Sequence, residues 1–125
     1  MVGEILKYSS DHLWVKKEDH FVRVGITEQL QSELDDIVFV ELPEIGERVE
    51  KNEPFVNIES VKTVSEIYSP VSGKIVEINE SVENDPKIMN SSPYDKGWLI
   101  VIELTNEKEL DTLLTKEEYE NKINK

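Results

Sequence analysis

The feature that most limits the possible folds of this chain is its series of short apolar runs separated by Gly and Pro. Runs such as "DIVFVEL", "PFVNIES" and "GWLIVIEL" are rich in β-branched and aromatic residues, which is typical of strands. Pro43 and Gly46 follow one run, and Pro70 and Gly73 lie in "SPVSG", at positions that suit turns. Many short strands punctuated in this way predict an all-β sandwich or barrel.

The N-terminal part predicts one hairpin followed by one short helix. In "HLWVKKEDHFVRVGI" two apolar segments flank the polar "KKEDH", which is the pattern of two strands and a turn. "TEQLQSEL" then predicts a helix near residues 28–34, because Thr27 can cap it and because Leu30 and Leu34 share one face.

The C-terminus is predicted to be helical. Capping-box spacing, in which two side chains satisfy the first backbone N–H groups of a helix, occurs in the pairs Asn106–Glu109 and Thr115–Glu118. At 125 residues the chain predicts one domain over 1–125, with a β-rich part over 1–104 and a helical part over 105–125.

A weak internal repeat suggests two similar half-sheets around one core. "IVFVELPEIGERVEKNEP" and "IVEINESVENDP" each have a strand pattern, a polar connection, a Val-Glu pair and a later Pro. Val49 and Pro54 of the first segment correspond to Val82 and Pro86 of the second.

Charge and composition exclude several classes of function. The net charge of −13 repels phosphate backbones and anionic lipids, so neither nucleic acid nor a membrane surface is an expected partner. The chain has no Cys and only two His, so we expect no metal site and no nucleophile–base pair of an enzyme. "MVGEILKYSS" has neither a signal peptide nor a membrane-spanning pattern, which predicts a cytoplasmic protein, with a monomer as the default state.

One lysine, Lys62, lies between two β-branched residues in "FVNIESVKTVSEIYSPVSG". Most lysines of a highly charged domain are solvated surface groups, and the residues alone favour that interpretation. If Lys62 lies at a hairpin bend, however, its ammonium projects freely and suits a modifying enzyme. "SVKT" lacks the Asn-Gly or Asp-Gly signal of a tight hairpin, so the pattern leaves both interpretations open.

The segment "ESVKTVSEIYSPVSGKIVEINE" closely resembles the lipoylation segment of the glycine cleavage system H protein family. "LKYSSDHLWV", "VGIT", "DIVFVELPEIG" and "NSSPYDKGWL" resemble further family motifs in the same order, so the resemblance covers almost the whole chain. It implies a lipoyl/biotinyl-carrier-like barrel-sandwich hybrid of two small stacked sheets. It also implies that Lys62 carries lipoate in amide linkage, with Glu59, Ser60, Val61 and Thr63 as the context recognised for lipoylation.

The partners implied by the resemblance do the chemistry, and the chain itself is expected to be a carrier rather than an enzyme. A pyridoxal-phosphate-dependent glycine decarboxylase loads the lipoyl arm with the aminomethyl group of glycine. A tetrahydrofolate-dependent aminomethyltransferase unloads the arm, and dihydrolipoyl dehydrogenase reoxidises it. A lipoate–protein ligase, or an octanoyl or lipoyl transferase, attaches the lipoyl group.

The resemblance also implies a cleft that holds the loaded arm, with Glu66 and His12 at it. From the residues alone, Glu66 is a solvated strand residue and His12 a structural or surface imidazole. The chain departs from the family at Leu13, where a glutamate is usual, and Leu13 cannot accept a hydrogen bond from an amine. A second departure is Asp35 in place of glycine, which Asp tolerates even if the position requires a positive φ.

Four alternatives stand beside the glycine cleavage carrier, of which an autonomous enzyme is the weakest because no nucleophile–base pair can be assembled. A lipoyl or octanoyl donor to 2-oxoacid dehydrogenases would keep the modified lysine, and Leu13 leaves that role open. An unmodified acidic interaction module would leave Lys62 as a plain ammonium. A biotin carrier is disfavoured, because biotin acceptors place methionines beside their lysine and here the neighbours are Val61 and Thr63.

Overall fold

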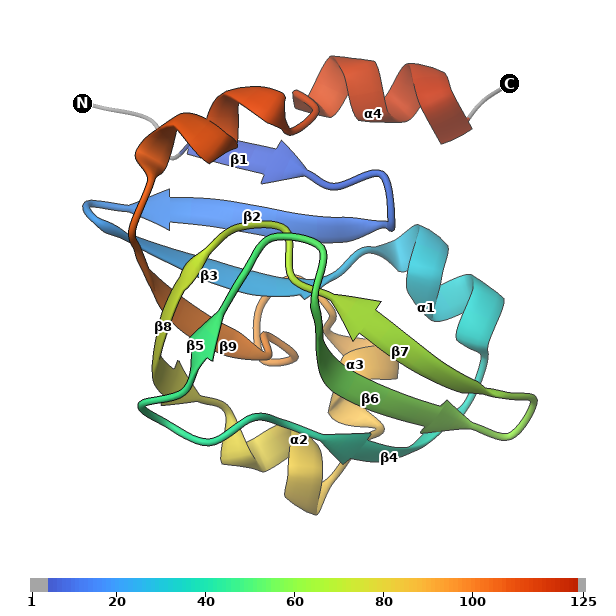
Figure 1. The fold of residues 1–125 in the computed structure, drawn as a ribbon. Helices are drawn as coiled ribbons and strands as arrows, with labels where there is room; N and C mark the ends of the chain where they lie inside the picture. The colour runs from blue at the N-terminus through green and yellow to red at the C-terminus, as the bar shows by residue number, and fades with distance from the viewer. Residues whose placement is uncertain (1–4, 124–125) are drawn as a thin grey trace.

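The structure, a computed structural model, describes residues 5–123 and is mostly β (Figure 1). The predicted parts 1–104 and 105–125 therefore begin and end in residues 1–4 and 124–125, which lie outside the described part. The strands are β1 Ile5–Tyr8, β2 Leu13–Glu18, β3 Phe21–Ile26, β4 Ile37–Glu41, β5 Arg48–Val49, β6 Pro54–Ser60, β7 Val64–Tyr68, β8 Gly73–Ile78 and β9 Ile100–Leu104. The helices are α1 Glu28–Leu34, α2 Glu80–Asn84, α3 Ile88–Ser91, the 3₁₀ helix η1 Glu107–Thr112, and α4 Lys116–Ile123.

The larger sheet has six strands in the order β1-β2-β3-β9-β8-β5. The predicted N-terminal hairpin is confirmed, because β2 and β3 pair antiparallel with Val15 opposite Val24. The turn between them is short because Asp19 adopts a φ of 64°, which Asp tolerates better than most residues. Strand β9 pairs with β3 on one side and with β8 on the other, so a strand from late in the sequence connects the N-terminal strands to the rest of the sheet.

The smaller sheet has three strands in the order β4-β6-β7, and β6 and β7 form a hairpin (Figure 1). One apolar core contains residues from both sheets, such as Ile58 of the smaller sheet and Ile102 of the larger, each with no exposed surface. Two sheets therefore share one main apolar core, as the predicted sandwich-like fold requires, and a second, smaller buried cluster contains Tyr8, Trp14 and Tyr119. Burying an isoleucine of this kind contributes about 1.5–3 kcal/mol.

The prediction of two similar half-sheets is wrong. The sheets have six and three strands, and the turn around Pro70 carries the chain from β7 in the smaller sheet to β8 in the larger. The internal repeat also has no structural counterpart, because Val49 lies in strand β5 whereas Val82 lies in helix α2. Both valines are buried, so the repeated pattern reflects two separate contributions to the core.

Helix α1 begins and ends as the sequence predicts. The Thr27 side chain accepts a hydrogen bond from the backbone N–H of Leu30, and Leu30 and Leu34 are buried. The helix stops at Asp35, whose φ of 65° leaves the helical region. The position where the family usually has glycine therefore does have a positive φ, and Asp35 adopts it.

The C-terminal part contains both predicted helices but only one of the two capping boxes. Thr115 and Glu118 form reciprocal hydrogen bonds, with each side chain accepting from the other's backbone N–H at 2.9 and 3.2 Å. The side chain of Glu109 does not cap its own helix. Its carboxylate instead accepts from the backbone N–H and hydroxyl of Ser72 at 2.6 and 2.8 Å, because η1 packs over the turn that precedes β8.

The two tryptophans differ in burial. Trp14 is buried, and its indole N–H donates to the carbonyl of Pro93 at 2.9 Å. Trp98 is only half-buried, and the guanidinium of Arg23 lies 4.3 Å from its ring centre. Within residues 5–123, no helix is both long and apolar enough to cross a membrane.

Candidate functional site

Lys62 lies at the tip of the β6–β7 hairpin, which projects from the edge of the molecule (Figure 1). Ser60 closes the turn: its backbone N–H donates to the carbonyl of Thr63 at 2.8 Å, and its hydroxyl accepts from the N–H groups of Lys62 and Thr63, both at 3.2 Å. The N–H of Val61 donates to the carbonyl of Asp36 at 3.0 Å, which ties the tip to the chain beside helix α1. A serine side chain thus makes the turn that the absent Asn-Gly signal could not predict.

The ammonium of Lys62 is accessible and only weakly held. Its side chain is 59% exposed, and Nζ lies 3.7 Å from the carboxylate of Asp35, which is 56% exposed. An ion pair exposed to this degree contributes between about 0 and 1 kcal/mol. Neutralising the ammonium by acylation would therefore cost the fold little, and the side chain meets the steric and energetic requirements of an amide-linked prosthetic group.

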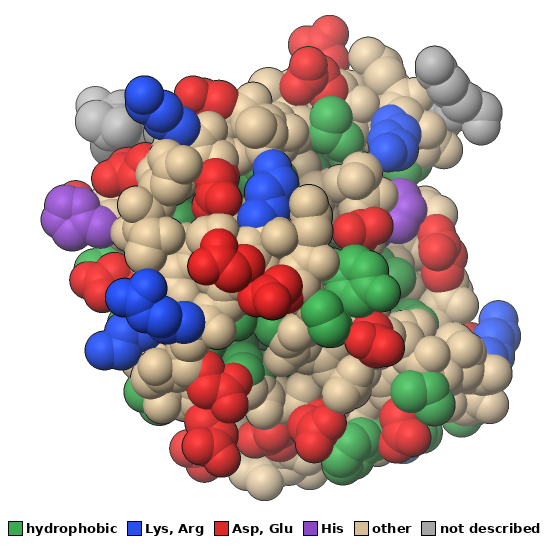
Figure 2. All heavy atoms as spheres, viewed as in Figure 1, with side chains coloured by type: hydrophobic (Ala, Val, Ile, Leu, Met, Phe, Trp, Pro, Cys, Tyr) green, Lys and Arg blue, Asp and Glu red, His purple; other side chains and the backbone are tan. Residues whose placement is uncertain are grey.

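Apolar side chains surround the hairpin tip without being buried. Val61 and Val64 are 62% and 65% exposed, and Phe39 lies in the same cross-strand row as Glu59 and Val64 on the outer face of the smaller sheet. Figure 2 shows acidic side chains scattered over much of the visible face, with hydrophobic ones between them. The lysine is therefore presented on a mixed apolar and acidic surface.

Asp35 gives a direct test of the backbone beside the tip. We expect Asp35→Gly to increase the free energy of unfolding by about 1 kcal/mol, because glycine relieves the strain of φ 65° while the lost ion pair is exposed. The next residue, Asp36, is not among the described residues with a positive φ. Asp36→Gly should therefore lower the free energy of unfolding by about 0.5–1 kcal/mol. Urea unfolding of both variants measures the difference, and equal effects of the same sign would contradict the strained conformation.

A cleft of about 360 Å³ lies between helix α1, strand β7 and the loop that precedes β2. It brings together His12 and Glu66, the two residues that the resemblance implied for a cleft. It also contains Asp11 and Glu33, which sequence reasoning missed because nothing in their local patterns distinguishes them from solvated acids. The remaining lining residues are Ser10, Leu30, Ser65, Ile67 and Tyr68.

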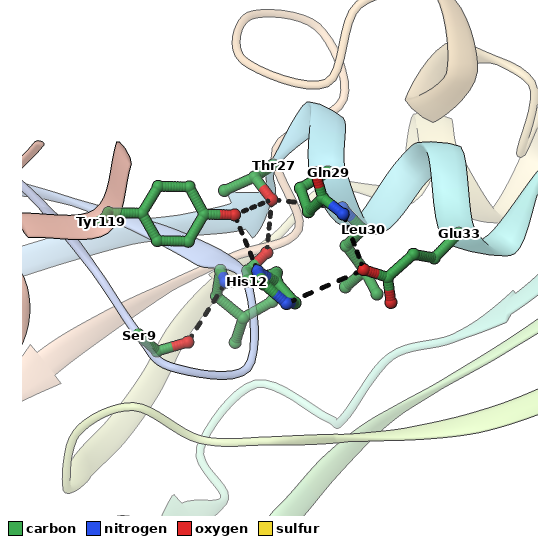
Figure 3. Close-up of polar contacts among 8 residues, drawn as sticks. Ser9, His12, Thr27, Gln29, Leu30, Glu33 and Tyr119 are labelled. Carbon is green, nitrogen blue, oxygen red and sulfur yellow. Dashed lines mark hydrogen bonds and ion pairs between the residues drawn. The ribbon is translucent and has the colours of Figure 1, made fainter. Parts of the chain in front are cut away.

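The ring of His12 lies between Tyr119 and Glu33, and its hydrogen bond is to Tyr119 (Figure 3). Its Nδ1 lies 2.8 Å from the hydroxyl of Tyr119 in helix α4, and its Nε2 lies 3.8 Å from the carboxylate of Glu33 in helix α1. Tyr119 is buried, stacks on Tyr8 with ring centres 4.6 Å apart, and also contacts the Thr27 hydroxyl at 2.9 Å. Burial raises the pKa of Tyr119 above its ordinary value, so its hydroxyl stays protonated at neutral pH.

The same desolvation acts on two tyrosines near Tyr119. Burial raises the pKa of Tyr8 and of Tyr94, and for Tyr94 the hydrogen bond from the backbone N–H of Glu28 opposes that effect. These hydroxyls are therefore neutral hydrogen-bonding groups and not sources of charge for the cleft.

Leu13 lies in the core and not in the cleft. It has no exposed surface, belongs to the main apolar cluster, and is absent from the cleft lining although its neighbour His12 is present. The carboxylates of the cleft come from Asp11, Glu33 and Glu66.

The other predicted site residues lie on the hairpin and away from the cleft. Glu59 and Ser60 end strand β6, and Val61 and Thr63 flank Lys62 at the tip. His20 lies elsewhere, 4.0 Å from Glu107 beside η1. Within the described residues, no group of His, Asp and Glu side chains is arranged to hold a metal ion.

Comparison with known proteins gives one consistent result. The family described as Glycine cleavage H-protein matches residues 6–125. The chain is 60% identical over 115 residues to the glycine cleavage system H protein of Oceanobacillus iheyensis, covering 92% of this chain and 91% of the relative. It is 57% identical over 119 residues to that of Anoxybacillus flavithermus, covering 95% and 94%. The crystal structure of a glycine cleavage system H protein from Mycobacterium marinum superimposes with a TM-score of 0.90 at 38% identity, covering 99% of this chain and 100% of that one.

Proposed function

The chain belongs to the glycine cleavage H-protein family, whose members are lipoyl carriers and not catalysts, and from that premise we propose that its lipoyl group is attached to Lys62. The observation that carries the proposal is the position of Lys62 on the tip of a hairpin, exposed and in a weak ion pair with Asp35. Bound lipoate supplies a dithiolane that accepts a one-carbon amine and two electrons. The chain supplies the attachment point, the reach and the surfaces for docking.

The distance from the tip to the cleft suits this role. A lysine side chain extended by a lipoyl group reaches ~14 Å, counting single bonds of roughly 1.5 Å. Glu66 lies in β7, four residues after Lys62 at the turn, and a segment of that length spans at most about 13 Å at the rise of a strand. An arm folded back along β7 would end at the cleft that His12, Glu33 and Glu66 line.

The carrier role implies the three enzymes of the glycine cleavage system as partners: the decarboxylase, the aminomethyltransferase and dihydrolipoyl dehydrogenase. We add to these a lipoate–protein ligase, or an octanoyl or lipoyl transferase, that recognises Lys62 within Glu59–Thr63. The exposed Val61 and Val64 and the acidic surroundings favour enzyme clefts with an apolar mouth and a basic rim. We propose that the carrier acts as a monomer, since each enzyme must admit the hairpin tip.

The test of this proposal is the intact mass of the protein after co-expression with lipoate–protein ligase and feeding with lipoate. One lipoyl increment, mapped to the peptide that contains Lys62, is the expected result. An unmodified mass, with the protein folded and the ligase active on a known acceptor, would refute lipoylation and support the unmodified interaction module instead.

A second candidate function, donation of lipoyl or octanoyl groups to 2-oxoacid dehydrogenases, is favoured by one observation. Leu13 is buried and contributes no carboxylate to the cleft, so one contact that the family uses for an amine is missing. Glycine–bicarbonate exchange with the partner decarboxylase separates the two roles. The lipoylated protein should support the exchange if it serves glycine cleavage, whereas a dedicated donor should not.

A further inference from the structure

We propose that His12 presents an unprotonated Nε2 to the cleft, as a hydrogen-bond acceptor for the amine carried on the arm, and that Tyr119 and Thr27 hold it in that tautomer. The inference rests on the proposed function, because the amine reaches the cleft only on a lipoyl arm at Lys62. Tyr119 is a positioning residue in this arrangement, since it acts through His12 and lines no part of the cleft.

The tautomer follows from counting hydroxyl protons. The Thr27 hydroxyl lies 3.0 Å from the backbone carbonyl of His12, which can only accept, so the Thr27 proton is donated there. The contact of 2.9 Å between Thr27 and Tyr119 then requires that Tyr119 donate to Thr27. The Tyr119 oxygen, having used its only proton, must accept from Nδ1 of His12 at 2.8 Å.

This arrangement satisfies every contact in the network (Figure 3). The Thr27 oxygen accepts from Tyr119 and from the backbone N–H of Leu30, which fills both of its lone pairs. With the opposite tautomer, Tyr119 would donate to His12, and Thr27 could not serve both Tyr119 and the His12 carbonyl with one proton. Neutral His12 therefore carries its proton on Nδ1 and leaves Nε2 bare.

The distance between Nε2 of His12 and the carboxylate of Glu33 fits two groups that both accept hydrogen bonds. Nε2 lies 3.8 Å from the Glu33 carboxylate, well beyond the usual range of a hydrogen bond. The carboxylate has a donor of its own in the side-chain amide of Gln29 at 2.9 Å, so its position does not depend on His12. Two acceptors at this spacing leave room for a donor between them.

An amine is the donor that fits. A protonated amine has three N–H groups and no acceptor, and the charged and imidazole groups of the cleft wall are Nε2 of His12 and the carboxylates of Glu33, Glu66 and Asp11. The bare Nε2 and Glu33 would take two of the three N–H groups. They would supply contacts that Leu13, buried in the core, cannot.

The backbone of His12 is held in a strained conformation by hydrogen bonds. Its φ is 69°, a conformation that costs a non-glycine residue of order 1–2 kcal/mol. Its N–H donates to the Ser9 carbonyl at 3.1 Å, and its carbonyl accepts from the Thr27 N–H at 3.0 Å. Together with the Tyr119 contact, these bonds fix both the backbone and the ring.

The tautomer can be measured without any lipoyl group. In NMR spectra of protein with ¹⁵N-labelled histidine at about pH 8.5, where imidazoles are neutral, a protonated and an unprotonated ring nitrogen have different ¹⁵N chemical shifts. We expect protonated Nδ1 and bare Nε2 at His12, and a shift toward the Nε2–H form in Tyr119→Phe, which keeps the ring stacked on Tyr8. Tyr94→Phe is the matched control, because the Tyr94 hydroxyl contacts the backbone of Glu28 and lines no part of the cleft. An Nε2–H tautomer in the unaltered protein would overturn the proposal.

The effect on the cargo is measured on lipoylated protein loaded with the aminomethyl group and then separated from its partners. Water releases the cargo as formaldehyde and ammonium and returns the thiol, and intact mass follows the loss. We expect Tyr119→Phe to speed this loss about fivefold, the value of one hydrogen bond, and Tyr94→Phe to change it less than twofold. Equal rates in Tyr119→Phe and the unaltered protein would overturn the role of His12 as an acceptor.

The two proposals fail in distinguishable ways. If Lys62 is not lipoylated, the intact mass shows it before any loading is attempted, and the inference about His12 falls with it. If Lys62 is lipoylated and supports exchange while Tyr119→Phe leaves both the tautomer and the rate of loss unchanged, only the inference about His12 is wrong.

Discussion

Lys62→Arg is expected to abolish lipoylation completely while leaving the fold unchanged. Arginine keeps the positive charge beside Asp35, but its guanidinium stays protonated and offers no amine lone pair for an amide bond. The side chain is more than half exposed, so the free energy of unfolding should change by less than about 0.5 kcal/mol. Intact mass should show no lipoyl increment, and glycine–bicarbonate exchange should fall to the background measured without carrier.

Lys74→Arg is the matched control for this substitution. Lys74 is another exposed lysine of the β-rich part, in strand β8 of the larger sheet. The variant should be lipoylated and should support exchange like the unaltered protein. A lipoyl increment that persists in Lys62→Arg, or that disappears in Lys74→Arg, would show that the attachment site is elsewhere.

Gly73→Ala is expected to lower the free energy of unfolding by about 3 kcal/mol or more. Gly73 pairs with Val49 on one side and Leu104 on the other, at the start of β8. A methyl group at this position would overlap the backbone carbonyl of Glu103, which belongs to the central strand β9 and cannot rotate away as a side chain could. The cost therefore includes displacement of β8 from β9, within the sheet that forms one wall of the core.

Gly46→Ala separates this clash from the general cost of replacing a glycine. Gly46 has a φ of 97°, and a methyl group there would meet no atom within 4 Å. Only backbone strain should contribute, at about 1–2 kcal/mol. Urea unfolding of the two variants gives the comparison, and a loss in Gly73→Ala no larger than that in Gly46→Ala would mean that β8 and β9 adjust freely.

The elements that the sequence predicts are those determined by local pattern. Alternation of apolar residues was sufficient for the β2–β3 hairpin, and Thr27 with Leu30 and Leu34 was sufficient for α1. The same local reasoning was wrong for Glu109, because a capping-box spacing cannot reveal that the carboxylate has a better partner in Ser72, far along the chain. It was also wrong about two similar half-sheets, since pairing of β3 with β9 depends on contacts remote in sequence.

The candidate site divides in the same way. Lys62 was predicted from a motif that is continuous in sequence, although its turn depends on a serine side chain and not on the usual turn dipeptides. The cleft is assembled from a loop, a helix and a strand, so Asp11 and Glu33 could not be distinguished from the chain's other acidic residues. Tyr119 was equally hidden, because the C-terminal segment resembles a solvated helix until its one buried ring is located.

The closed turn at Ser60 has a consequence for how strongly the cleft must bind. Because the turn fixes the root of the arm, the arm's end is confined to a sphere of ~14 Å radius, which corresponds to an effective concentration on the order of 0.1 M. A cleft with an intrinsic dissociation constant of roughly 10 mM would then hold the cargo about nine-tenths of the time. A few acceptors on an open wall are sufficient at that concentration, and a partner enzyme has only this small free energy to overcome when it draws the arm out.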